Sequence, residues 1–155
     1  MPGTDTVSSR VPPTNEIRTG SYEAPTPGAV AGARTIATSE LVSLMAASPP
    51  PVLIDVLDGV STSLPGATLL AGAGEGTGLD DGVQRRLAVK LATLTRDDRT
   101  RPVVLFCLSQ TCWLSHNAAV RAVAAGYTNV LWYRGGRGAW LEAGLPLMPV
   151  RPAPW

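Results

Sequence analysis

The sequence is poor in cysteine and lysine and has no long hydrophobic run, and each shortage excludes a class of protein. Two cysteines in 155 residues cannot build the disulfide framework of a small secreted scaffold. The longest apolar run, Val103 to Leu108, is far shorter than the roughly 18 residues that a membrane span needs. Thirteen basic residues, of which only Lys90 is lysine, balance 12 acidic ones, and the net charge of +1 gives no long-range attraction for nucleic acid or an anionic membrane.

The two ends of the chain differ in texture from its middle. The N-terminal sequence MPGTDTVSSR lacks the basic and apolar segments of a signal peptide, so the chain as it stands is that of a cytoplasmic protein unless an export signal has been removed. Residues 1–34 are rich in proline and glycine and are expected to form an arm, either flexible or laid along the domain, with Tyr22 as its anchor. Residues 35–148 are expected to form one domain, followed by a tail over 149–155.

The middle of the chain alternates between strand and helix patterns. Thr38 and Ser39 are expected to cap a helix that ends before Pro49–Pro51. The glycine-rich loop after the first strand lacks the Walker spacing, so it is not expected to bind phosphate. Such alternation predicts an α/β fold with a parallel central sheet flanked by helices on both faces. After the first helix, the expected elements are a strand over Val52–Val56, a loop over Asp58–Gly82, a helix over Val83–Leu94, a strand over Val103–Phe106, a helix over Ser115–Ala125, a strand over Asn129–Tyr133 and a helix over Arg137–Ala143.

Cys107 stands where such a sheet binds its ligands. It follows a buried strand and precedes a loop that leads into a helix, and ligands of open α/β sheets bind beyond the carboxyl ends of the strands. Backbone amides and the helix dipole there stabilise a thiolate and any anion brought to it. The alternative is that Cys107 is a small buried apolar residue. Its position favours a nucleophile.

The residues that follow Cys107 offer further chemistry. Cys112 is close enough in sequence to form a disulfide with Cys107 or to resolve a persulfide or sulfenic acid on it, or it simply packs the loop. His116, the only histidine, either polarises the thiolate or lies on the surface, and Ser115 and Asn117 are expected to cap the helix. Two cysteines and one histidine do not make a zinc site, so neither a metal nor another cofactor is expected.

The motifs VLIDV, LPGA, VVLFC and NVLWYRGGRGAWLEAGLP, in this order, resemble a rhodanese domain over about Thr38 to Leu147. The resemblance implies a rhodanese-like fold in which Cys107 accepts sulfur as a persulfide from a small donor and passes it to a small acceptor. Asp55 would then close its strand near the same face. The implied anion-binding loop, whose amides point at the sulfur, consists of Leu108, Ser109, Gln110, Thr111, Cys112, Trp113 and Leu114, with Ser115 after it.

The loop departs from the rhodanese pattern because it is longer and contains no arginine or lysine. The family often carries an arginine there, and a hydrogen bond to a charged group is worth about 1.5–3 kcal/mol. The departure argues against ordinary thiosulfate:cyanide activity. Arg134 and Arg137 in the neighbouring turn either supply the missing charge or are solvated turn residues.

A narrower resemblance comes from YEAPTPGAVAGARTI and CLSQTCWLSHNAAVRAVAAGYTNVLWY. These segments are similar to the rhodanese-like CXXCW-motif proteins linked to pyrroloquinoline-quinone-dependent catabolism, although four residues instead of two separate the cysteines here. The resemblance implies a periplasmic protein, a quinoprotein dehydrogenase or its cytochrome as partner, and an ordered segment from Tyr22 to Pro27.

Three functions follow from these observations. The leading one is a sulfurtransferase that carries sulfur on Cys107. The second is a thiol–disulfide redox protein that uses Cys107 with Cys112. The third is a catalytically silent module that binds a quinoprotein partner, which the missing loop arginine and the apolar, tryptophan-bearing loop favour.

Overall fold

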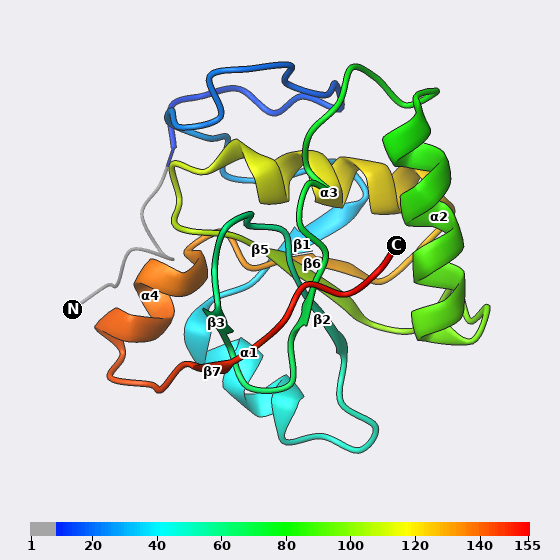
Figure 1. Cartoon of the computed structure of the whole chain (residues 1–155). Helices are drawn as coiled ribbons and strands as arrows, with labels where there is room; N and C mark the ends of the chain where they lie inside the picture. The colour runs from blue at the N-terminus through cyan, green and yellow to red at the C-terminus, as the bar shows by residue number, and fades with distance from the viewer. Residues whose placement is uncertain (1–8) are drawn as a thin grey trace.

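A five-stranded parallel sheet forms the centre of the computed structural model, which describes residues 9–155 (Figure 1). Its spatial order is β1-β6-β5-β2-β4. A separate antiparallel pair joins β3 to β7. The bounds of the strands are Ala33–Thr35 for β1, Val52–Asp55 for β2, Thr62–Ser63 for β3, Thr68–Leu69 for β4, Val103–Phe106 for β5, Val130–Trp132 for β6 and Met148–Pro149 for β7.

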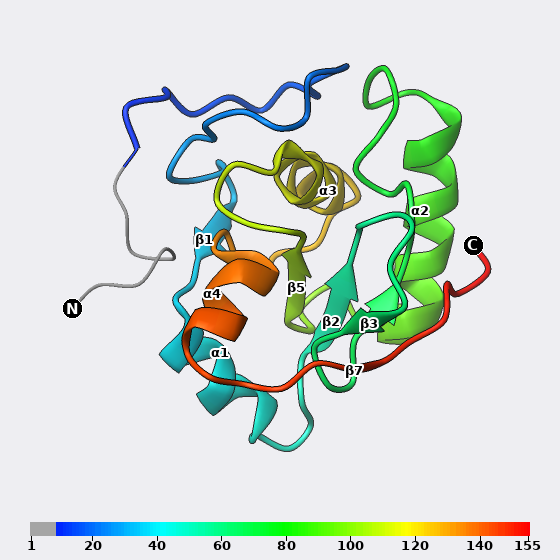
Figure 2. The same cartoon turned by 60° about the vertical axis from the view of Figure 1, so that its left-hand side comes forward.

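Helices cover both faces of the sheet (Figures 1 and 2). The helices α2 (Gly82–Thr95) and α3 (Trp113–Ala124) lie on one face, and α1 (Thr38–Met45) and α4 (Gly136–Glu142) lie on the other. The predicted α/β fold is therefore confirmed. No helix within residues 9–155 is long and apolar enough to cross a bilayer.

The alternation of side chains along β5 divides the core in two. Val103, Leu105 and Cys107 belong to the core under α2 and α3. Val104 and Phe106 belong to the core under α1 and α4. Because β5 is central and buried on both faces, its sequence is continuously apolar, as parallel strands require. Cys107 therefore points to the side of the sheet that α3 covers.

The predicted helices form, with corrections at their starts. The first helix begins with Ala37 as N-cap and without a side-chain cap, and the Thr38 hydroxyl lies 2.7 Å from the Tyr133 hydroxyl instead. Helix α3 begins at Trp113, two residues before the predicted start, so Ser115 and Asn117 lie inside it and cap nothing. Both corrections have one cause, because tertiary partners take the polar side chains that local capping would use.

Four strands, β1, β3, β4 and β7, were not predicted. β3 and β4 lie inside the expected loop, β1 begins two residues before the expected start of the domain, and β7 extends one residue past its expected end. The strands β3, β4 and β7 have two residues each, too few to show a pattern, and most of β1 lies in the proline- and glycine-rich segment that was expected to form the arm. The C-terminal tail packs against the sheet, where the Ala153 amide donates to the Leu69 carbonyl at 2.8 Å.

The N-terminal arm lies along the domain from residue 9 onward. It crosses the start of α3 and the cysteine loop, which we define as residues 108–114 (Figure 2). The arm was expected to be either flexible or laid along the domain, and its described part lies along the domain. The first eight residues, which include most of the segment tested for a signal peptide, lie outside the described residues.

Candidate functional site

Cys107 directly follows β5 and is 1% exposed. The Ser115 amide donates to its Sγ at 3.3 Å, and the Ser115 hydroxyl lies 3.1 Å from the same sulfur. The Trp132 indole in turn donates to the Ser115 hydroxyl at 3.0 Å. Ser115 and Trp132 are both fully buried, so water does not compete for these groups.

The chemistry of these groups fixes the direction of the chain of hydrogen bonds. An indole N–H only donates, so the Ser115 oxygen accepts from Trp132 and its own hydrogen is free to point at Cys107. A thiolate on Cys107 would receive two hydrogen bonds from one residue, one from its amide and one from its hydroxyl. Such donors stabilise the charged form of a buried thiol. We call Trp132, Ser115 and Cys107 the thiol relay.

Cys107 and Cys112 form a disulfide, which was one of the alternatives for this pair. Their Cα atoms lie 6.4 Å apart, inside the range that a disulfide needs. Both cysteines are buried, and no free cysteine remains in the chain. A free thiol or thiolate on Cys107 exists only when this bond is reduced.

The cysteine loop does not surround the sulfur with its amides in this form. The Cys112 amide donates to the Ser109 carbonyl at 3.0 Å, and the Trp113 amide donates to the Tyr22 carbonyl at 2.7 Å. The Thr111 amide points to the Ser109 hydroxyl. The arm and the loop itself therefore hold amides that the rhodanese resemblance assigned to the sulfur.

The arm adds to the cysteine loop much as a strand adds to a sheet edge. Glu23 pairs with Cys112 in an antiparallel bridge, and the Ala24 amide donates to the Thr111 carbonyl at 2.9 Å. The Trp113 indole donates to the Pro25 carbonyl at 3.1 Å. The segment from Tyr22 to Pro27, which the narrower resemblance implied to be ordered, thus covers the loop.

A second part of the arm holds the first turns of α3. The Arg18 guanidinium lies 4.7 Å from the Trp113 ring centroid. The Asn117 side chain accepts from the Arg18 amide at 3.0 Å and donates to the Arg18 carbonyl at 2.9 Å. Sequence reasoning missed Arg18 because no local pattern marks a contact across 99 positions.

Arg134 lies at the edge of the site. It is 5% exposed and donates to the Thr26 hydroxyl at 3.0 Å and to the Thr26 carbonyl at 3.2 Å. Burial lowers the pKa of its guanidinium. Together with Arg10 and Gln110 it borders a pocket of about 270 Å³ beside the cysteine loop. Arg134 is therefore not a solvated turn residue, and Thr26 is a further residue of the site that the sequence did not single out.

Arg137 and the buried Asp55 form an ion pair on the other face of the sheet. The Arg137 guanidinium lies 3.4 Å from the Asp55 carboxylate and donates to the Thr62 hydroxyl at 3.1 Å. Burial raises the pKa of Asp55, and hydrogen bonds from the Ser63 hydroxyl and the Leu57 amide oppose that effect. Asp55 lies at the same edge of the sheet as Cys107 but faces α4, so the two side chains are not brought together.

His116 is fully buried, so the expectation of a surface residue is wrong. Its ring packs edge-on between two indoles, with centroid distances of 4.5 Å to Trp113 and 5.6 Å to Trp132. Burial lowers its pKa, which keeps the imidazole neutral near pH 7. His116 thus supports both the residue that holds the arm and the residue that begins the thiol relay.

The glycine turn before α4 fixes the backbone of Cys107. Gly136 has φ of +60°, and a Cβ there would overlap the Cys107 carbonyl. The close approach lets the Arg137 amide donate to the Cys107 carbonyl at 2.9 Å and the Gly138 amide to the Leu108 carbonyl at 2.8 Å. Within residues 9–155, no three His, Cys, Asp or Glu side chains come together in a way that could hold a metal ion.

Comparison with known proteins agrees with the fold. The family model described as "Rhodanese-like domain" matches residues 38–143. No curated protein matches the chain. At sequence identities of 18% to 22%, similarity to solved structures establishes the fold alone.

Two of the similar structures carry a named activity. A thiosulfate sulfurtransferase from Pseudomonas aeruginosa is 22% identical over 77% of this chain, with a TM-score of 0.57, and the match spans only 21% of that protein. A polysulfide-sulfur transferase homodimer from Wolinella succinogenes is 20% identical over 76% of this chain and 80% of its own, with a TM-score of 0.51. A protein from Lactobacillus plantarum is 18% identical over 70% of this chain and 82% of its own, with a TM-score of 0.52.

Proposed function

This chain belongs to the rhodanese-like family, and from that premise we propose that it is a sulfurtransferase whose Cys107 carries sulfur as a persulfide. The observation that carries the proposal is the thiol relay, because it directs two donors from Ser115 at the sulfur of Cys107. The thiol lies at the carboxyl end of a central strand, where this kind of sheet binds ligands.

The proposed reaction begins from the reduced protein. The Cys107 thiolate attacks the outer, sulfane sulfur of a donor, the donor's sulfur–sulfur bond breaks, and the rest of the donor leaves as an anion (sulfite from thiosulfate, a thiolate from a small persulfide). Cys107 then carries the persulfide Cys–S–S⁻. A thiolate acceptor attacks the outer sulfur, leaves as a persulfide itself and restores the Cys107 thiolate. The electrons of the two steps balance without any cofactor.

In this proposal, the positive charge that binds the anionic sulfur donor comes from residues outside the cysteine loop. Arg10 and Arg134 border the pocket beside Gln110, and guanidinium groups suit sulfonate and carboxylate anions. We therefore assign the anionic end of the donor to this pocket. Because the loop itself has no cation, persulfides and polysulfides of small anionic thiols are expected to serve better than thiosulfate.

The disulfide favours a second candidate, the thiol–disulfide function. The Cys112 thiol would attack the inner sulfur of the persulfide on Cys107, which forms the Cys107–Cys112 bond and releases the outer sulfur as HS⁻. The disulfide must then be reduced by an external thiol pair before another turnover. In this function both cysteines are required, whereas sulfur transfer to an external acceptor requires Cys107 alone.

Intact mass spectrometry distinguishes these functions. The reduced protein, freed of reductant, is mixed with cysteine persulfide or with thiosulfate, and the Cys107→Ser and Cys112→Ser variants are treated in parallel. A sulfurtransferase gains one sulfur that survives in the wild type and in Cys112→Ser and is absent from Cys107→Ser. A redox protein loses that sulfur as sulfide and recovers the mass of the disulfide form unless Cys112 is replaced.

The same experiment tests the silent module. If no donor adds mass to any variant and iodoacetamide does not alkylate reduced Cys107, the sulfur-carrier proposal is wrong. The remaining proposal is then a module that binds a quinoprotein dehydrogenase or its cytochrome in the periplasm. The half-exposed Leu108 side chain on the cysteine loop would lie at that interface, because it is the large apolar residue next to the thiol.

A further inference from the structure

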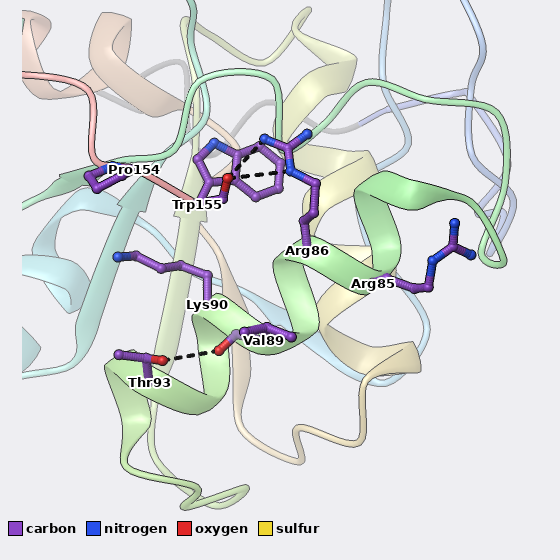
Figure 3. A pocket seen from close by; sticks show the side chains of 7 residues that line it. All are labelled: Arg85, Arg86, Val89, Lys90, Thr93, Pro154 and Trp155. Carbon is purple, nitrogen blue, oxygen red and sulfur yellow. Dashed lines mark hydrogen bonds between the residues drawn. The ribbon is translucent and has the colours of Figure 1, made fainter.

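A groove of about 430 Å³ lies between the exposed side of α2 and the last two residues (Figure 3). The helix contributes Arg85, Arg86, Val89, Lys90 and Thr93, and the tail contributes Pro154 and Trp155. Among the described residues, its lining shares none with the cysteine loop or with the thiol relay. The volume lies in the range of sites for small organic ligands.

The floor of the groove is apolar and already in place. Val89 is 70% exposed and lies beside Trp155 in the lining of the groove. The Trp155 ring is fixed from two sides, because its indole donates to the Ala71 carbonyl at 3.1 Å and the Arg86 guanidinium lies 4.1 Å from its centroid. A rigid aromatic wall opposite an exposed valine suits the apolar body of a ligand.

The rim of the groove is positively charged. The sequence of α2, GVQRRLAVKLATLT, contains three basic residues and no acidic one. Arg85 points away from the tail and donates to the Asp80 carbonyl, and Arg86 donates to the backbone oxygen of Trp155, the last residue of the sequence (Figure 3). Lys90 makes no ion pair with any described residue, and its ammonium extends toward the tail (Figure 3). One available cation beside an apolar floor complements a monoanion with an apolar body.

We propose that this groove is a binding site for a small apolar monocarboxylate, with the carboxylate opposite Lys90 and the hydrocarbon or aromatic body against Trp155 and Val89. The proposal does not depend on sulfur chemistry at Cys107. It gives the protein a ligand site on α2 in addition to the site at the end of β5.

Lys90 supplies a specific probe, because it is the only lysine in the chain. Reductive methylation with isotope-labelled formaldehyde keeps its charge and gives one side-chain lysine signal in NMR spectra. Titration with phenylbutyrate is expected to shift that signal in a saturable manner, whereas phenylbutanol, which has the same body without the charge, is expected to bind at least about tenfold more weakly. Calorimetry on unmodified protein gives the two dissociation constants.

Variants separate the two halves of the proposed site. Val89→Ser, at an exposed helix position, and Lys90→Gln, at a partly buried one, are each expected to weaken phenylbutyrate binding by about five- to tenfold. Arg151→Gln, which removes an exposed charge outside the groove, is the matched control and should bind as the wild type does. Cys107→Ser should also bind normally, so a failure of the sulfur-carrier proposal would not affect this result. Equal binding of phenylbutyrate and phenylbutanol, equal loss in Arg151→Gln, or no saturable shift would each overturn the proposal.

Discussion

At the scale of single residues, the Ser115 hydroxyl is the group whose removal tests the site most directly. It connects the Trp132 indole to the Cys107 sulfur. In reduced Cys112→Ser protein, the added Ser115→Ala change removes one hydrogen bond to the thiolate, worth about 1.5–3 kcal/mol. We therefore expect alkylation of Cys107 by iodoacetamide near pH 7 to slow by about tenfold or more. The measurement is the second-order rate constant.

Two controls keep this result specific. Ser115→Thr retains a hydroxyl and should retain most of the rate. Ser109→Ala removes a hydroxyl of the cysteine loop that lies 3.0 Å from Thr111 and does not belong to the relay, so its rate should be unchanged. If Ser109→Ala and Ser115→Ala slow alkylation equally, the relay does not activate the thiol.

The relay also shows how far sequence reasoning reaches at this scale. Cys107 could be placed at a strand end because the apolar run before it and the helix after it are local patterns. The role of Ser115 could not be predicted, because a serine near the start of a helix resembles a cap. Only the fold brings Trp132 to Ser115, across 17 positions of the sequence. Arg137 likewise looked free to serve the thiol, but the alternation of side chains sends its partner, Asp55, to the opposite face of the sheet.

At the scale of elements, an ion pair joins α2 to α3 in addition to their apolar contacts. Arg121 of α3 is fully buried and bonds through both terminal nitrogens to Asp81, the N-cap of α2, at 2.9 Å each. Burial alone would raise the pKa of Asp81, but hydrogen bonds from Arg121 and from the Gln84, Thr77 and Gly78 amides outweigh it and hold the pKa well below its usual value. The pair thus ties the glycine-rich loop and two helices together.

Replacing Asp81 with alanine should therefore destabilise the fold strongly. The change leaves the Arg121 charge buried without its partner, for which the expected cost is about 3–5 kcal/mol in the free energy of unfolding. Asp80→Ala is the matched control, because the neighbouring acid is exposed and should change stability by less than about 0.5 kcal/mol. Urea denaturation followed by circular dichroism measures both, and similar midpoints for the two variants would contradict this account of the interface.

The helices were predictable from the spacing of their apolar residues, and the central strands from short, continuously apolar runs. The strand over Val103–Phe106 forms at its predicted bounds, and α2 forms within one residue of its expected ends. The ion pair that joins α2 to α3 was not predictable, because nothing in the sequence near Arg121 distinguishes it from a solvated helical arginine. The ion pair also explains one glycine of the glycine-rich loop, since a Cβ at Gly76 would overlap the Arg121 and Asp81 side chains.

At the scale of the whole molecule, the arm and the cysteine loop form one closed unit over the thiol. The loop holds both ends of the disulfide close together, and the arm holds the loop through main-chain hydrogen bonds and the Trp113 indole. Because both cysteines are buried, a reductant reaches the disulfide only when this unit opens. We therefore expect the arm to control how fast the disulfide form returns to the thiol form.

This control can be measured by comparing two tryptophans with matched contacts. Trp113 donates its indole N–H to the Pro25 carbonyl in the arm at 3.1 Å, and Trp140 donates its own to the Pro146 carbonyl at 2.7 Å on the opposite face of the sheet. Each change to phenylalanine removes one such bond, worth about 0.5–1.5 kcal/mol. Trp113→Phe is expected to speed reduction of the disulfide by dithiothreitol by about two- to tenfold, because opening of the arm becomes easier, whereas Trp140→Phe should lower global stability without that increase. Equal reduction rates for the two variants would mean that reduction proceeds without displacement of the arm.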